Sequence, residues 1–408
     1  MERAAALHAD IHKLVSSQAL SKLGDNFTEV ALALFVLRIT QHNVAALGVV
    51  LAMVYAPRVT LGWMVAGFID RLPKRAALVG ADLARAALVA SIPVVASYGW
   101  TIAAVFLTYA FAMVYQPILR AVQPQIAGSP EVNALSAARQ QTYYAVADIG
   151  AYIAAGAIIF LVGLAPAFWL DALTYLGSAV FVLSIKGGPE VWRLVRGPAS
   201  GFWQDIAVGF RFIRSQGLVL GLTLVSAGMF LAVGALNTLL APLSRSRWHV
   251  SSAHYVWLLL AIALGSLVSG VIIERARLAE RLSSRVLVTV GFILTGVGFG
   301  AVDLASTWEV GLGCLFVAGL GNALYGSFLM AWVQRVTPIA VRARVLALRG
   351  VGNGVGGAMG ALLTGFLAAS VGLVLAVAAT FLLWCVLAVS VLALGSLKSA
   401  GTEESIAM

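Results

Sequence analysis

Ionisable side chains inside long apolar segments are the residues of this sequence with the clearest capacity for chemistry. Lys22, Asp25 and Glu29 lie in the first such segment, Arg58 in the second and Asp148 in the fifth. A charged side chain in the interior of a bilayer is unfavourable by about 3 kcal/mol or more, so it needs a partner or a water-filled cavity. These positions are therefore candidates for ion pairs, a proton relay or a substrate cavity.

Counting along two helices predicts which of these charges meet. At 1.5 Å per residue, Glu29 lies about 14 Å and Asp25 about 20 Å below Arg38 at the outer surface, and Arg58 lies about 21 Å below Val44. Asp25 and Arg58 are thus the predicted ion pair. Glu29, one turn higher on the same helical face, has no equally placed cation. We expect it to be the main proton-carrying site, for which cationic or amphipathic cargo competes; the alternative is a static triad in which Glu29 also reaches Arg58.

Three further features lie in the same apolar segments, with Asp82 and Arg85 near the cytoplasmic end of the third. Asp82 and Arg85 are three residues apart on one helical face and are expected to neutralise each other. Asp148 is either a buried acid held by a neighbouring helix or a residue of the cavity wall. The tyrosines predicted near cavity level, which suit an amphipathic cargo or serve only in packing, are Tyr144, Tyr152 and Tyr325.

The amino-acid composition indicates that these segments span a membrane. Of 408 residues, 61% are hydrophobic and only 11% are charged, whereas soluble domains carry about 25% charged residues. The fold class is therefore an all-α polytopic membrane protein. The twelve predicted transmembrane helices span residues 14–39, 44–69, 76–98, 101–124, 135–160, 165–185, 217–243, 252–273, 285–304, 308–333, 343–370 and 371–395.

The positive charges predict the orientation. Of the 27 Lys and Arg residues, 21 fall in segments on one predicted face and three on the other. Because cytoplasmic loops carry the excess of Lys and Arg, both termini are predicted to be inside. This bias also accounts for the net charge of +10, so no nucleic-acid partner is inferred.

The twelve segments divide into two similar halves. The predicted domains are an N-terminal six-helix half at 1–185, a cytoplasmic linker with an amphipathic helix at 186–216 and a C-terminal six-helix half at 217–408. An acid–arginine pair, Glu274-Arg275, stands where the first half has Asp70-Arg71. Seven glycines between Gly350 and Gly365 imply either close helix packing or a moving gate in the eleventh helix.

The charged turn between the second and third helices carries the most specific pattern. Residues 66–75 place Asp70, Arg71, Lys74 and Arg75 on the charged positions of G-x-x-x-D-R-x-G-R-[RK], with alanine and proline at its two glycines. This turn resembles the loop 2–3 signature of the major facilitator superfamily. The resemblance implies that these residues, with Glu274 and Arg275, form cytoplasmic gates, and that Asp70 meets the N-terminal end of the eleventh helix.

Looser patterns are similar to the drug and siderophore exporter branch of that superfamily, which includes macrolide-efflux and enterobactin-exporter proteins. They are Gln116-Pro117, Asn133-Ala134-Leu135, Ala167-Phe168, Gly321-Asn322 and Val341-Arg342-Ala343-Arg344-Val345. The resemblance implies export. In the fifth helix, where many exporters carry a Gly-Pro motif, Gly150 is followed by Ala151.

Together these features predict a multi-pass protein of the plasma (inner) membrane that acts as a monomer and exports amphipathic small molecules in exchange for protons. A lysophospholipid flippase of the same fold is the alternative. An enzyme is not expected, because the sequence has no HExxH and no GxxxxGK[ST] motif. Cys314 and Cys385 lie in apolar runs, so no metal, cofactor or disulfide framework is expected.

Overall fold

The computed structural model describes residues 2–62, 73–127, 130–186, 192, 202–248 and 252–394, and the regular structure within these ranges is helical. The chain divides into two compact units. Unit 1 comprises residues 1–42 and 56–199, and unit 2 comprises residues 43–55 and 200–408. Helix α2 (Val44–Thr60) contributes to both units.

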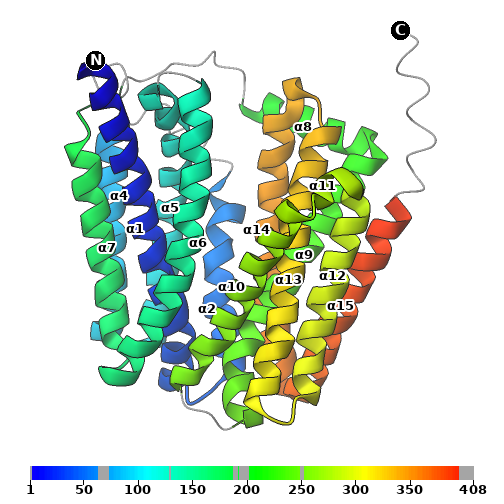
Figure 1. The fold of residues 1–408 in the computed structure, drawn as a ribbon. Coiled ribbons are helices and arrows are strands. Elements are labelled where there is room, and N and C mark those ends of the chain that lie inside the picture. The colour runs from blue at the N-terminus through cyan, green and yellow to red at the C-terminus, as the bar shows by residue number, and fades with distance from the viewer. Residues whose placement is uncertain are drawn as a thin grey trace, which may run out of the picture. The chain divides into compact units, whose positions relative to one another are not determined.

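Unit 1 is built from five further helices: α1 (Glu2–Ile39), α4 (Lys74–Val95), α5 (Tyr98–Ala127), α6 (Pro130–Leu161) and α7 (Ala165–Ser184). Helix α1 packs against α6 and α7, and α4 packs against α5 and α7 (Figure 1). Buried positions recur every three or four residues along α4, from Leu78 to Ile92. One face of α4 is therefore committed to the interior of the unit.

Unit 2 repeats this packing pattern. Its elements are α8 (Phe202–Ser215), α9 (Gly217–Trp248), α10 (Ser252–Arg275), α11 (Leu278–Arg281), α12 (Ser284–Ala301), the 3-10 turn η2 (Val302–Leu304), α13 (Trp308–Val336), α14 (Ile339–Val371) and α15 (Leu373–Leu394). Helix α9 packs against α14 and α15, as α1 packs against α6 and α7. Helix α12 packs against α13 and α15, as α4 packs against α5 and α7.

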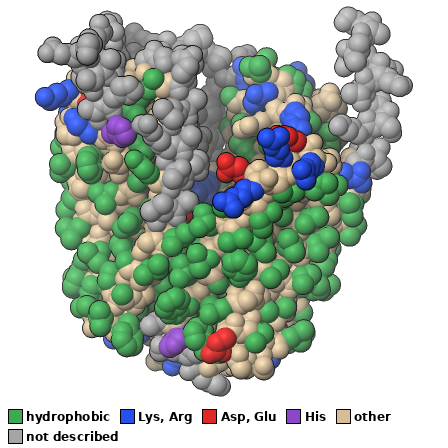
Figure 2. Space-filling view, in the orientation of Figure 1, with side chains coloured by type: hydrophobic (Ala, Val, Ile, Leu, Met, Phe, Trp, Pro, Cys, Tyr) green, Lys and Arg blue, Asp and Glu red, His purple; other side chains and the backbone are tan. Residues whose placement is uncertain are grey.

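The outward surface of α7 shows that its surroundings are apolar. Its exposed side chains repeat every three or four residues, while its opposite face buries Asp171, Thr174, Tyr175 and Ser178. The exposed residues are Trp169, Leu173, Leu176, Val180 and Leu183. A helix that is polar inside and apolar outside fits a lipid environment. Figure 2 shows the same preference, with a broad hydrophobic surface and charged side chains gathered toward one end of it.

Nine helices of the described part of the chain are long and apolar enough to cross a membrane. This confirms an all-α polytopic protein. The count of twelve spans and the orientation of the termini stay predictions.

Glycines of α14 permit close contact with two neighbours in unit 2. A Cβ added at Gly356 or Gly360 would collide with the carbonyl oxygen of Ala227 or Leu231 on α9, respectively. One added at Gly365 would lie 3.0 Å from Gly48 Cα. Close helix packing therefore explains these glycines, and a moving gate stays a prediction.

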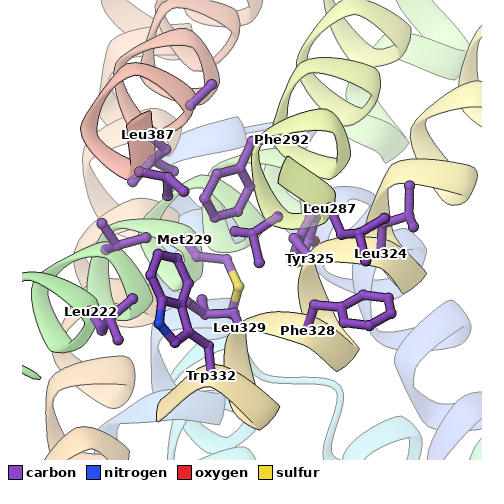
Figure 3. Close-up of a cluster of buried hydrophobic side chains, with 14 of the residues drawn as sticks. Leu222, Met229, Leu287, Phe292, Leu324, Tyr325, Phe328, Leu329, Trp332 and Leu387 are labelled. Atoms are coloured by element: carbon purple, nitrogen blue, oxygen red, sulfur yellow. The ribbon is translucent and has the colours of Figure 1, made fainter. Parts of the chain in front are cut away.

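A core cluster of unit 2 combines aliphatic and aromatic side chains (Figure 3). The rings of Phe292, Tyr325 and Trp384 pack with centroids 5.1–5.6 Å apart. Tyr325 is only 3% exposed, and its hydroxyl donates to Asn322 Oδ1 at 2.6 Å. The placement of Tyr325 among the cavity tyrosines was therefore wrong. Its neighbours on α12 and α15, which no local pattern specifies, enclose it in the core.

Candidate functional site

A polar face runs along the middle of α1 in unit 1. Gln18, Lys22, Asp25 and Glu29 recur every three or four residues, so their side chains leave the helix on one side. The side chains of Lys22 and Asp25 are each 35% exposed. The face therefore combines side chains that packing holds with carboxylates that solvent can reach.

Arg85 of α4 connects this face to the interior of the unit. Its Nη2 lies 2.8 Å from Asp25 Oδ1 and donates to the Tyr175 hydroxyl at 2.7 Å. Its guanidinium carbon stands 4.0 Å from the centre of the Tyr175 ring, and Tyr175 donates to Asp25. Three helices thus contribute one side chain each to a closed triangle, in which Asp25 is fixed as a charged partner of Arg85.

Asp82 extends the network toward α5. Its Oδ1 lies 3.8 Å from Arg85 Nη1, which confirms the predicted pair on α4. Its Oδ2 accepts a hydrogen bond from Ser178 at 2.7 Å, and the Ser178 hydroxyl lies 3.1 Å from that of Tyr115. Asp82 is fully buried, so the charge of Arg85 is shared between one buried and one accessible carboxylate.

The predicted partner of Asp25 needs correction. The structure places Arg85, not the predicted Arg58, in the ion pair with Asp25. Arg58 is exposed near the end of α2. Counting residues from the membrane surface could not predict this ion pair, because the count gives a distance along one helix and does not show which helices are neighbours. Helices α1 and α4 both pack against α7, and that packing brings Asp25 to Arg85.

Asp171 of α7 is an acid that the sequence analysis missed. It is fully buried and accepts hydrogen bonds from Thr28 of α1 and, at 3.4 Å, from Thr174 Oγ1. Gly24 makes this crossing possible: an added Cβ would collide with Thr174 Oγ1 and Asp171 Oδ1. The sequence contains a signal for this site: within an apolar helix, Asp171 stands three residues before Thr174.

Lys22 and Asp148 form a second ion pair. Lys22 Nζ lies 3.3 Å from Asp148 Oδ1 and donates to Asn26 Oδ1 at 3.0 Å. Asn26 Nδ2 donates to Asp148 Oδ1 at 2.6 Å. Asp148, on α6, is therefore held by α1, yet its side chain stays 35% exposed. The hold by a neighbouring helix agrees with the first alternative, although the acid is not buried, and a place in a cavity wall stays a prediction.

Glu29 differs from Asp25, the other acid of this face. Within the described ranges its carboxylate takes part in no ion pair or hydrogen bond. It is half-buried and one turn from Asp25. Lys22, about two turns earlier on α1, attracts it electrostatically without forming an ion pair with it, so the expectation that Glu29 has no equally placed cation stays a prediction.

The tyrosines of α6 lie beside the same face. Tyr144 donates to Gln18 Oε1 at 3.0 Å, and Gln140 Nε2 donates to the Tyr144 hydroxyl at 2.8 Å. Tyr144 and Tyr152 are both half-buried. Their role toward a cargo stays a prediction.

Part of the predicted gating loop lies outside the described residues, including Asp70 and Arg71. Lys74 begins α4 and is 6% exposed, and its Nζ has no hydrogen-bond partner among described groups. Arg75 donates to the carbonyl of Leu183, and its guanidinium carbon lies 5.6 Å from the centre of the Trp192 ring.

The matching position in unit 2 is at the surface. Glu274 and Arg275 end α10 with exposed side chains. The nearby ion pair joins Arg277 and Glu280 at 3.9 Å, both about 70% exposed. An exposed pair of this kind contributes little to stability, so a gating role for Glu274 and Arg275 stays a prediction.

The searched part of the chain holds no group of three His, Cys, Asp or Glu side chains suited to a metal ion. The polar face therefore offers fixed ion pairs and, at Glu29, a carboxylate with no ion pair or hydrogen bond among the described residues. That combination can bind a proton or a polar group of a small molecule at Glu29 while Asp25 remains paired with Arg85.

Solved transporter structures share this fold over nearly the whole chain. The nucleoside transporter NupG has a TM-score of 0.76 at 13% identity, covering 94% of this chain and 98% of its own. A bacterial homologue of the iron transporter ferroportin, in an inward-facing state, has a TM-score of 0.75 at 14% identity and coverages of 95% and 98%. At such identities the likeness shows the fold alone.

The sequence match falls in the second half. Residues 222–405 match the family model described as Major Facilitator Superfamily. The chain resembles the Major Facilitator Superfamily in both sequence and fold. The resemblance predicted from residues 66–75 is thereby confirmed by a separate part of the chain.

Curated relatives of the chain are exporters. The enterobactin exporter EntS of Citrobacter koseri is 29% identical over 166 residues, which are 41% of this chain and 39% of that protein. EntS of Escherichia coli O127:H6 is 28% identical over the same coverage. The match spans about two fifths of the length of these relatives, and it supports the predicted exporter-type resemblance.

Proposed function

We propose that the protein is a secondary active exporter of the plasma (inner) membrane, which exchanges protons for an amphipathic small molecule by alternating access. The observation that carries this proposal is the lack of a fixed partner at Glu29. Its carboxylate has no ion-pair or hydrogen-bond partner among the described residues, although Asp25 on the same face of α1 is ion-paired. A carboxylate without an ion-pair partner can be neutralised by a proton, whereas Asp25 is paired with Arg85.

The neighbouring ion pairs give Glu29 a defined setting. Arg85 and Tyr175 hold Asp25, one turn before Glu29 on α1, and Lys22, a further turn before, holds Asp148. Cargo with a polar or cationic group would compete with the proton for Glu29, which is the exchange that an antiporter needs. The half-buried Tyr144 and Tyr152 offer aromatic surface for the apolar part of such a cargo.

Transport in proteoliposomes tests the proposal. The purified protein would be given an imposed pH gradient and three cargo classes: a cationic dye, a catecholate siderophore and a lysophospholipid. The siderophore is included because the curated relatives are enterobactin exporters. Transport of the lysophospholipid alone, without dependence on the pH gradient, would instead identify a flippase.

Substitution of one acid separates coupling from cargo binding. Glu29→Gln should reduce pH-driven accumulation to the level of protein-free liposomes and leave cargo exchange at equal pH largely intact. Glu309→Gln is the matched control, because Glu309 is an exposed acid in the first turn of α13. If Glu29→Gln keeps full pH-driven accumulation, the proton site is elsewhere, and Asp148→Asn becomes the next variant.

A further inference from the structure

Arg349 of α14 lies deep inside unit 2. It stands ten residues after Ile339, the start of the helix, or about 15 Å along the axis. Its exposed fraction is 8%. The count of Lys and Arg residues by membrane face included Arg349 among the cytoplasmic cations. In the structure it lies within α14, away from the loop that precedes this helix.

The contacts of Arg349 do not neutralise it. Its Nη1 lies 2.9 Å from the thioether sulfur of Met330 on α13, and its buried Nε has no hydrogen-bond partner. No carboxylate among the described residues forms an ion pair with it. A guanidinium has five N–H donors and no acceptor, and sulfur is a weak acceptor. The site therefore holds a buried positive charge and several donors that lack an anion.

Asn353 adds a second donor group one turn further along α14. It is 9% exposed, and its Oδ1 accepts a hydrogen bond from Ser226 of α9 at 2.7 Å. This bond leaves the Nδ2 hydrogens of Asn353 without an acceptor among the described residues. Positions four residues apart lie on the same helical face, so Arg349 and Asn353 present donors on one side of α14.

We propose that Arg349 and Asn353 form an anion-recognition site in unit 2, for a carboxylate or phosphate group. A planar guanidinium binds both groups through two parallel N–H bonds. The group belongs either to the exported molecule or to a phospholipid. As a statement about cargo, this inference rests on the proposed export function, but it is tested by binding and not by pH-driven transport.

Thermal unfolding of the purified protein in a non-ionic detergent tests the site at constant ionic strength. Sodium benzoate and sodium phosphate are the free-anion probes. Protein in phosphatidylglycerol and phosphatidylcholine nanodiscs provides the lipid comparison. The Tm of the wild-type protein should rise with the concentration of an effective anion, because a ligand that binds the folded state stabilises it. A rise with benzoate or phosphate identifies a free anion, and a rise only with phosphatidylglycerol identifies a lipid.

Arg349→Met should abolish this rise, while its Tm without added anion stays equal to that of the wild-type protein or exceeds it. Arg335→Gln is the matched control, because Arg335 is an exposed arginine at the end of α13, and it should keep the full response. Asn353→Ala, a second variant, should reduce the apparent affinity several-fold.

Two results would overturn the proposal. One is a Tm rise of equal size in the wild-type protein and in Arg349→Met. The other is a large fall in the Tm of Arg349→Met without anion, which would mean that the chain itself supplies the counter-ion. Glu29→Gln should keep the anion response, so failure of the coupling proposal is distinguishable from failure of this one.

Discussion

Among the described residues each unit buries one arginine, and the two arginines have opposite surroundings. Arg85 in unit 1 is 5% exposed and lies between Asp25 and Asp82, with Tyr175 against its face. Arg349 in unit 2 is 8% exposed and has a thioether as its contact. Burial alone therefore does not define a role. The acids around the first arginine make it part of the scaffold, whereas no described acid pairs with the second, for which we propose an anion.

The acids of α1 show the same contrast over a single helical turn. Asp25 is fixed by Arg85 and Tyr175, whereas Glu29 has no such partner in the described part of the chain. Substitutions that remove one side chain at a time can distinguish charged side chains that have an ion-pair partner from those that do not.

The largest expected effect is at Arg85. Arg85→Met leaves Asp25 and the fully buried Asp82 without their cation. Breaking a buried ion pair by removing one partner lowers the free energy of unfolding by about 3–5 kcal/mol. Thermal or denaturant unfolding in a non-ionic detergent measures the loss, with Arg349→Met as the comparison. Equal losses in both variants would show that the two arginines do not belong to different classes.

A smaller loss is expected where α1 crosses α7. In Gly24→Ala the added methyl group collides with Thr174 Oγ1 and Asp171 Oδ1 and lies 3.0 Å from Thr174 Cβ. Overpacking of this kind costs about 1–3 kcal/mol, and the same unfolding assay reports it. In the control Gly80→Ala, on α4, the new Cβ meets no atom within 4 Å. An unchanged stability in Gly24→Ala would mean that the crossing is looser than described.

The smallest effect is expected at Asp70. Its substitution tests whether the contribution of a charged side chain in the predicted cytoplasmic loop also depends on the group that it contacts. If Asp70 meets the N-terminal end of α14, its carboxylate is stabilised by about 0.3–1 kcal/mol. Asp70→Asn should then fold and insert but shift the population toward the inward-facing state by about two- to fivefold. Accessibility of cysteines introduced on the cytoplasmic side measures the shift. Wild-type transport with unchanged accessibility would contradict it.

The sequence predicted the helices well because their signal is local. The predicted span 165–185 matches α7 (Ala165–Ser184), and 308–333 matches most of α13 (Trp308–Val336). Long apolar runs bounded by Pro, Gly and charged residues can be read without knowing the neighbours of a helix. The pair between Asp82 and Arg85 was equally predictable, since spacing of three residues on one helix brings the side chains together.

The polar contacts between helices were only partly predictable. The partner of Asp25 did not follow from its depth, because depth in the membrane does not show which helix lies alongside. Asp171 escaped notice since its meaning depends on Thr28 of another helix, and Tyr325 was misplaced since its burial depends on Phe292 and Trp384.

By itself, the sequence determined a polytopic α-helical membrane protein with charges at specified levels of its helices, and residues 66–75 determined the family resemblance. Tertiary structure decided which of those charges are neutralised. The physical reason is range: hydropathy and helical periodicity act within one segment, whereas an ion pair needs two side chains within about 4 Å. Only the packing of α1, α4 and α7 joined Asp25 to Arg85, and only the packing of α14 left Arg349 without an acid among the residues that the structure describes.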